Sequence, residues 1–439
     1  MLKDLYGENP AAVKIRDAAY PEPFRSGLEY NPPARGVWNI VHTGMLIPQS
    51  HQIFACAQGC LRGVILTAAE MNAADRMSWI ALEERDMFEG TLETDIIDGA
   101  AEIIRELPKK PRAILIFLSC MHLFAGCDFE TILTGLRELF PDIDFTDCYM
   151  APTMRKTISP DAKMRMQLYS LLKPLPADPR SVSIIGCDRP TDENSELVKI
   201  IRGAGLRLRD ITLCETYDEY LSMAESAVNI TYLPNAKPAG DSLERRLGTK
   251  HLYLPVSFDY EEIRRNYSLL CKTLGISIPD LSEDERAAED ALIAARELIG
   301  DTAVAVDFTA VSRPFGFAEL LCRHGFRVRY IFADSVNPED KGAFDSLKKD
   351  FPDIEIRSAV NAKMLCAPEL APEEKILAVG QKAAYYCATD YFVNIVSGGG
   401  FYGFAGICAL AGLMEDAYLH PKARREIIRL KGLGCESCL

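Results

Sequence analysis

The chain has 439 residues, 48% of them hydrophobic, and is long enough for several domains that each bury a core. Its formal net charge of -14 argues against nucleic acid or an anionic membrane as the main partner. No apolar stretch reaches the roughly 20 residues that span a bilayer, so we expect a cytoplasmic protein without a membrane or nucleic-acid partner.

Three similar units follow one another along the chain, each consisting of an apolar strand, a loop, an amphipathic helix and a second apolar strand. The first unit begins with a predicted strand at 113–118. Its helix begins near Phe129, directly after Asp128, because aspartate is a favoured helix N-cap. The returning strand starts near Ile143.

The second and third units repeat this order. The second has a predicted strand at 182–185 and a helix that ends near Gly203. The third has a strand at 303–306, a helix that starts at Pro314, and a returning strand at 327–332.

Strand–helix–strand units of this length form parallel sheets with right-handed crossovers. We therefore expect an α/β protein with three Rossmann-like, doubly wound domains at residues 1–178, 179–298 and 299–439. Ligands of such domains bind beyond the carboxyl ends of the strands. The loops that follow the first strand of each unit are thus the expected lining of a site between the domains.

The chain has 14 cysteines, which do not form a disulfide framework in a reducing compartment. Two pairs stand apart from the lone, apolar-flanked cysteines: Cys56 with Cys60, and Cys120 with Cys127. Cys120 follows the predicted strand 113–118 almost directly, and Cys60 and Cys127 lie where helices begin, where the helix dipole stabilises thiolates. Such thiolates suit an iron–sulfur cluster or zinc, and spacing alone does not choose between these and buried thiols.

At these residues the chain resembles component 1 of the nitrogenase superfamily. That family includes the nitrogenase catalytic subunits, their cofactor-assembly scaffolds, the light-independent protochlorophyllide and chlorophyllide reductases, and the cyclase of nickel-tetrapyrrole synthesis. Its members have a Gly-Cys before a helix, which matches Gly59-Cys60. They also have a strand that ends in a cysteine, then five residues and Gly-Asp-Asp, which matches Cys120 and Gly126-Cys127-Asp128 except at position 127.

The resemblance implies three Rossmann-like domains and an iron–sulfur cluster at a subunit interface, with Cys60 and Cys120 as ligands. Family members have another ligand cysteine well before the Gly-Cys loop, whereas this chain has no cysteine before Cys56. We infer that Cys56 and Cys127 replace it, so that four thiolates of one chain hold a [4Fe–4S]-type cluster. The alternative is a cluster shared across a dimer.

The resemblance does not extend to the molybdenum cofactor of nitrogenase. The chain has no cysteine between Cys214 and Cys271, where the family's cofactor ligand lies, and His420 lies beyond the expected histidine loop. Nitrogen fixation is therefore not expected, and a second metallocluster or a tetrapyrrole stays open as a further ligand.

The implied activity is that of an anaerobic, nitrogenase-like oxidoreductase. The chain has no G-x-x-x-x-G-K-[ST] phosphate loop, so an ATP-dependent iron–sulfur reductase is the implied electron donor. The implied assembly is a homodimer or a heterodimer with a related subunit. The alternative function is a non-catalytic scaffold for metallocluster or tetrapyrrole assembly, and a third is a zinc-stabilised binding protein.

Further candidates follow from position in the units. Arg189 follows the second-unit strand, where it either clamps an anionic ligand or pairs within its loop. His122, two residues after Cys120, is either a proton donor or a packed histidine. Asp307 and Arg313 flank the third-unit loop and are read in the same two ways as Arg189.

Two sequence motifs near the C-terminus complete the candidates. Gly398 and Gly400 lie in a G-x-G-x-x-G stretch, which is consistent with a dinucleotide site, an amide nest for an anion, or a structural turn. The terminal pair Cys435 and Cys438 forms a C-x-x-C motif that would suit a redox dithiol or a metal.

Overall fold

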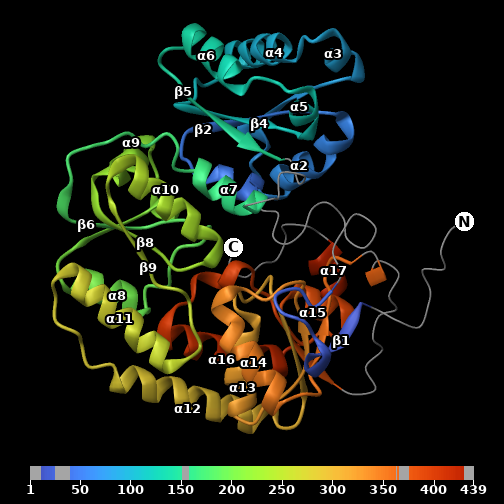
Figure 1. Ribbon diagram of the computed structural model, residues 1–439, viewed down its shortest axis with the longest axis vertical. Helices are drawn as coiled ribbons and strands as arrows, with labels where there is room; N and C mark the ends of the chain where they lie inside the picture. The colour runs from blue at the N-terminus through green and yellow to red at the C-terminus, as the bar shows by residue number, and fades with distance from the viewer. Residues whose placement is uncertain (1–10, 25–39, 151–157, 362, 365–374, 430–439) are drawn as a thin grey trace, which may run out of the picture.

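The computed structural model describes residues 11–24, 40–150, 158–361, 363–364 and 375–429. These residues fold around three separate sheets, which Figure 1 shows with the first sheet at the top, the second at the left and the third below. The Cys435–Cys438 pair lies outside the described residues. Within them, no helix is both long enough and apolar enough to cross a membrane.

The first sheet is built entirely from parallel strands in the order β3-β2-β4-β5. Its strands are β2 (Ser50–Cys56), β3 (Met77–Ala81), β4 (Ala113–Leu118) and β5 (Asp144–Tyr149). Its helices are α1 (Ile40–Met45), α2 (Gln58–Glu70), α3 (Glu84–Glu89), α4 (Leu92–Glu106), α5 (Cys120–Ala125), α6 (Phe129–Leu139) and α7 (Pro160–Gln167). The chain runs from β2 outward to β3 and then returns to the other side of β2, so the topological switch point lies between β2 and β4.

The second sheet repeats this topology, with parallel strands in the order β7-β6-β8-β9. Its strands are β6 (Asp178–Ile184), β7 (Arg207–Asp210), β8 (Ser226–Thr231) and β9 (Lys250–Tyr253). Its helices are α8 (Glu196–Gly203), α9 (Tyr217–Ser222), α10 (Lys237–Leu247), α11 (Tyr260–Leu274) and the long connecting helix α12 (Ser282–Ile299). The switch point is between β6 and β8.

The third sheet has the order β1-β12-β11-β10-β13-β14. Its strands are β10 (Ala303–Asp307), β11 (Arg327–Phe332), β12 (Glu355–Arg357), β13 (Ile376–Val379), β14 (Phe392–Val393) and the antiparallel edge strand β1 (Ala12–Lys14). Its helices are α13 (Pro314–Arg323), α14 (Lys341–Asp350), α15 (Gln381–Tyr386), α16 (Gly403–Leu419) and α17 (Arg424–Arg429). Its switch point is between β10 and β13. The α/β fold with parallel-strand sheets expected from the sequence is confirmed, whereas β1, expected in the first domain, pairs with the third sheet.

Local sequence signals account for many element ends. The Asp128 carboxylate accepts hydrogen bonds from the amides of Glu130 and Thr131, so the predicted N-cap of α6 is confirmed. Pro314 starts α13, as expected, because it has no amide hydrogen to lose in the first turn. The alternation along β2 sends Phe54 and Cys56 into the core beneath α1, α2 and α7, and sends Ile53 and Ala55 into the core beneath α4 and α6.

The second and third domains are joined by buried polar anchors. Arg313, at the start of α13, donates to Asp340 Oδ1 over 2.9 Å, to Val256 O over 2.9 Å and to Glu262 Oε2 over 2.6 Å. The last two acceptors belong to the second domain. One apolar core also runs through both domains and includes residues of β6, β8, β10 and β13. These contacts make the two domains one packed unit, and they give Arg313 a structural role.

Candidate functional site

The cysteine site lies at the switch point of the first sheet. Cys56 is the last residue of β2, and Cys120 is the first residue of α5, directly after β4. These strands are hydrogen-bonded neighbours in parallel, with Ala55 opposite Leu118. Cys60 lies in the first turn of α2, which follows β2. Because the carboxyl ends of two neighbouring strands meet here, the three cysteines converge at the edge where doubly wound sheets bind ligands.

The pKa shifts of these cysteines show that the three thiols influence one another. Burial, with smaller contributions from the neighbouring Cys60 and Cys120, raises the pKa of Cys56 to about 12. The pKa of Cys60 is raised by burial and then by Cys120. Cys56 is fully buried, Cys120 is half-buried and Cys60 is exposed, so the group opens to the surface on one side. Thiols with raised pKa values stay protonated until a metal displaces the proton.

Cys127 does not join this group. It lies between α5 and α6, where the Glu93 carboxylate of α4 is its charged neighbour. Burial, together with the Glu93 carboxylate, raises the pKa of Cys127 to about 12. The backbone N–H of Asp128 also donates to Glu93 Oε1 over 2.8 Å. Glu93 was not identified from the sequence, because no motif connects it to Cys127 and Asp128, which lie more than 30 positions away.

His122 serves the local fold. The backbone N–H of Ser119 donates to its Nδ1 over 2.9 Å, which closes a capping box around the start of α5. The ring is fully buried, and its Nε2 has no hydrogen-bond partner among the described residues. Burial lowers the pKa of His122. The imidazole is therefore neutral near pH 7 and holds the backbone that carries Cys120, which leaves a proton-donor role as an untested prediction.

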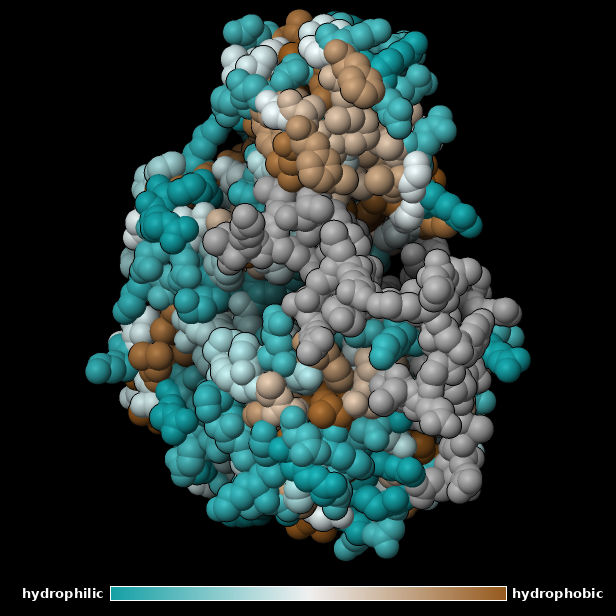
Figure 2. Space-filling view, turned by 45° about the vertical axis from the view of Figure 1, so that its right-hand side comes forward, coloured by the Kyte–Doolittle hydropathy of each residue, from teal (hydrophilic) through white to brown (hydrophobic). Residues whose placement is uncertain are grey.

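Exposed apolar side chains lie on the helices that carry Cys60 and Cys120. Figure 2, which turns the right-hand side of Figure 1 forward, shows apolar side chains gathered over the first domain. Large exposed side chains come from the helices on that side: Phe88 of α3 is 88% exposed, Phe124 of α5 is 73% exposed, and Leu66 of α2 is 46% exposed. Single exposed apolar residues are common, whereas a contiguous patch marks an interaction surface. We call these three residues the apolar patch.

Arg189 lies in the loop after β6, at the switch point of the second sheet. His42 of α1 faces it from the first domain: burial lowers the pKa of His42, and the Arg189 guanidinium lowers it further, whereas Asp188 acts in the opposite direction. The loop is held by Arg165 of α7, whose fully buried guanidinium lies 3.2 Å from Asp188 Oδ1. His42 was not identified from the sequence, because only the fold brings it to Arg189.

The Gly398–Gly400 stretch lies where the second and third domains meet. Ser397, Gly398, Gly399 and Gly400 all have positive φ, a left-handed turn that favours glycine. The amides of Ser397 and Gly398 donate to Thr309 O and Ala310 O over 2.7 Å and 2.9 Å. Gly400 O accepts from Asp192 N over 3.0 Å, and a Cβ on Gly400 would overlap the Pro190 carbonyl.

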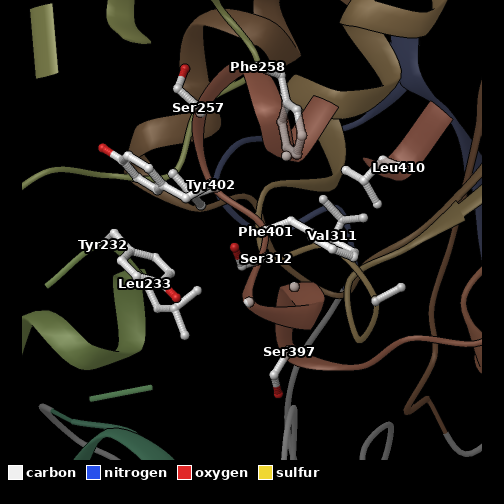
Figure 3. A pocket seen from close by; sticks show the side chains of 16 residues that line it. Tyr232, Leu233, Ser257, Phe258, Val311, Ser312, Ser397, Phe401, Tyr402 and Leu410 are labelled. Carbon is white, nitrogen blue, oxygen red and sulfur yellow. The ribbon is translucent and has the colours of Figure 1, made fainter. Parts of the chain in front are cut away.

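The space beside this turn is small. Figure 3 shows it between Phe258, Ser312 and Phe401, with the side chains of Val311 and Leu410 on one side. Its volume is about 20 Å³, which holds about one water molecule. The geometry therefore favours a structural turn that packs the Arg189 loop against the third domain, and ligand binding at Gly398 and Gly400 stays an untested prediction.

The donor geometry bears on which metal would fit the cysteine site. Among the described residues, no group of three or more His, Cys, Asp or Glu side chains converges as the ligands of a single metal ion. Zinc requires such convergence, with sulfur ligands about 2.3 Å from one ion. An iron–sulfur cluster puts several iron and sulfide atoms between its thiolates, so its ligands need not meet at one point. Cysteine thiolates are ligands of both groups, so the donor set is compatible with a zinc ion and with a cluster.

Comparisons with known proteins agree with this fold. Residues 41–390 match the family model described as nitrogenase component 1 type oxidoreductase. A solved structure titled "Nitrogenase Cp1 at pH 6.5" is 13% identical, covers 90% of this chain and 94% of its own, and has a TM-score of 0.68. Another, "Nitrogenase Cp1 at pH 5", is 13% identical, covers 95% of both chains, and has a TM-score of 0.56. At this identity the structures support the fold alone, and no curated protein matches the chain.

Proposed function

The chain belongs to the nitrogenase component 1 type oxidoreductase family, and from that premise we propose that it is a catalytic component that carries an iron–sulfur cluster at the cysteine site. The ligands in this proposal include Cys56, Cys60 and Cys120. When bound, the cluster would relay single electrons, and the protein would orient it, exclude water and hold the substrate nearby. The proposal includes a cytoplasmic, anaerobic setting.

The observation that carries the proposal is the meeting of three thiols at the β2–β4 switch point. Cys56 and Cys120 end or directly follow neighbouring parallel strands, and Cys60 opens the helix between β2 and β3. Buried thiols that served packing alone would have no reason to gather at the ligand-binding edge of the sheet.

The substrate region in this proposal lies at the switch point of the second sheet, on the side where helix α1 of the first domain approaches it. His42 of the first domain and Arg189 of the second interact electrostatically there. A guanidinium beside a neutral imidazole suits an anionic group of a substrate, such as a carboxylate. The buried ion pair between Arg165 and Asp188 would keep Arg189 in place.

The proposed partners are a second subunit and a separate electron donor. The apolar patch, whose Leu66 shares helix α2 with the exposed Cys60, supports a second subunit, because exposed apolar surface is stabilised by being covered. The subunit is another copy of this chain or a related one. The chain has no phosphate-binding loop, which supports an ATP-dependent iron–sulfur reductase as the electron donor.

The test is metal and sulfide analysis of protein purified without oxygen, together with EPR of the dithionite-reduced state. We expect a brown protein with iron and acid-labile sulfide in equal amounts, and a cluster signal that Cys120→Ala abolishes. Cys148→Ala is the matched control, because Cys148 is a fully buried thiol on the adjacent strand β5. A wild-type protein without iron, or with zinc in its place, would contradict the proposal.

A non-catalytic scaffold would give the same analysis, and turnover separates the two functions. A catalytic component is oxidised and reduced repeatedly while it keeps its cluster. A scaffold passes its cluster to an acceptor protein and loses iron in doing so. Iron content before and after repeated cycles of dithionite reduction and reoxidation by methylene blue, in the presence of an apo-ferredoxin, therefore discriminates them: constant iron supports the catalytic component.

A further inference from the structure

A side chain of the first domain reaches into the switch point of the second sheet. Arg165 of α7 is fully buried and extends to the loop that follows β6, where it donates to Gly186 O and to Asp188 Oδ1. On its own helix it pairs with Asp161, whose Oδ2 lies 3.2 Å from Arg165 Nε. The guanidinium therefore joins the two domains at the edge where doubly wound sheets bind ligands.

The backbone of this loop is held by the same segment of the chain. Gly186 has φ 80°, and a Cβ on it would overlap Ala236 Cβ. Its amide donates to the Tyr169 hydroxyl over 2.7 Å, and its carbonyl accepts from Arg165. Because Arg189 follows three residues later, these contacts set the position of its backbone.

Two buried carboxylates share this one guanidinium. The side chain of Asp161 is 6% exposed and that of Asp188 is 8% exposed, so water screens their charges poorly. Asp161 Oδ2 accepts one N–H of Arg165 and the side-chain amide of Asn235. Its Oδ1 is buried and has no hydrogen-bond partner in the described part of the chain. A buried carboxylate with one oxygen unpartnered favours its neutral form.

We propose that Asp161, Arg165 and Asp188 form a proton-sensitive joint between the first and second domains. When Asp161 takes up a proton, Arg165 is no longer shared, the repulsion between the two carboxylates disappears, and the loop at residues 186–189 is held more firmly. When Asp161 is ionised, the loop is held less firmly. The joint needs no cluster, whereas its use, control of the substrate region beside Arg189, rests on the proposed function.

The charged neighbours of Asp161 agree with this assignment. Burial raises the pKa of Asp161 and Asp188 raises it further, whereas Arg165 and Asn235 lower it without cancelling the rise. The contribution of Asp161 to stability is therefore complete below the unfolded-state value of 3.8 and is lost as the pH rises through the folded-state pKa. His42 of α1 is a further titratable group that interacts with Asp188, and burial lowers its pKa.

Hydrogen–deuterium exchange of the full chain, followed by mass spectrometry, measures how firmly residues 186–189 are held. Asp161→Asn mimics the protonated carboxyl and should slow the exchange of these amides several-fold at about pH 7.5. Asp188→Asn should speed it several-fold, because Arg165 loses its carboxylate partner in the loop. The matched control is Asp218→Asn, which removes an exposed ion pair between the two domains, with Arg112, and should leave the exchange unchanged.

The wild-type protein provides a second test, which does not depend on the folding of a variant. Its exchange at residues 186–189, corrected for the intrinsic effect of pH on amide exchange, should slow as the pH is lowered through the folded-state pKa of Asp161. In Asp161→Asn this dependence should be absent. Infrared difference spectra over the same pH range should show more protonated carboxyl in wild type than in Asp161→Asn.

The outcomes separate this inference from the proposed function. Exchange at residues 186–189 that is as fast in Asp161→Asn as in wild type would overturn the joint. Equal carboxyl bands in the two proteins would overturn it as well. Neither measurement requires iron, so a protein without a cluster would contradict the proposed function and leave the test of the joint intact.

Discussion

Replacing Arg313 with Met should uncouple the second and third domains. The Arg313 side chain is 6% exposed and bonds to Asp340, which is fully buried, and to Glu262 and Val256 of the second domain. Methionine keeps most of the volume and removes the charge. Asp340 would then be a buried carboxylate without its cation, and breaking such a pair costs about 3 to 5 kcal/mol.

The loss should also depend on pH. Burial raises the pKa of Asp340 to about 6, and Arg313 opposes that shift. Without Arg313 the pKa of Asp340 rises further, so folded Arg313→Met takes up a proton at a pH where folded wild type does not. As the pH is lowered from about 8 to about 6.5, the difference in the free energy of unfolding between wild type and Arg313→Met should therefore shrink by about 1 kcal/mol.

Urea unfolding followed by circular dichroism at the two pH values measures both effects. The control is Arg323→Met on the same helix, because that side chain is 54% exposed and its pair with Glu319 spans one helical turn. It should change the free energy of unfolding by about 0.5 kcal/mol or less. A loss in Arg313→Met below about 1 kcal/mol, or one equal at both pH values, would refute the reasoning.

Three further predictions concern other parts of the molecule. Burial raises the pKa of Asp210 from 3.8 to about 6, so its contribution to stability is complete below pH 3.8 and is lost as pH rises through 6. Asp210→Asn should therefore make the thermal unfolding midpoint less dependent on pH over this range. A variant whose midpoint depends on pH as steeply as that of wild type would contradict the assignment. Gly403 has φ 72°, and a Cβ there would overlap the Tyr267 hydroxyl and Glu196 Oε2. Gly403→Ala should therefore lower the free energy of unfolding by about 2 kcal/mol or more. Gly412→Ala on the same helix should not lower it, because a Cβ at that position meets open space. Phe124→Asp places a charge in the apolar patch and should shift the protein to a smaller species in light scattering, whereas Ile293→Asp on α12, also an exposed apolar site, should not; equal masses for wild type and Phe124→Asp would argue against an interface at the patch.

Much of the fold could be predicted because its signals are local. The strand Ala113–Leu118 and the strand Arg327–Phe332 have the bounds expected from their apolar runs. The N-cap Asp128 and the helix start at Pro314 depend on chemistry within one helical turn. By contrast, the pairing of Ala12–Lys14 with β12 joins segments more than 300 residues apart, and three residues carry no periodicity that would predict it.

The candidate site shows the same limit. The sequence placed Cys56, Cys60 and Cys120 at strand ends and helix starts, and the parallel register of β2 and β4 brings those ends together. It also predicted a helix start for Cys127, but only the fold brings Cys127 close to Glu93 of α4. Glu93 and His42 lie in helices without any motif, and their roles emerge only from packing between distant segments.

The most direct measurement of the central claim is the position of iron in a crystal of protein purified without oxygen. Anomalous diffraction collected on both sides of the iron absorption edge locates iron without assuming any ligand. The account predicts a cluster of iron peaks bonded to the sulfurs of Cys56, Cys60 and Cys120. An iron-free cysteine site, or iron peaks that lie away from these three sulfurs, would contradict it.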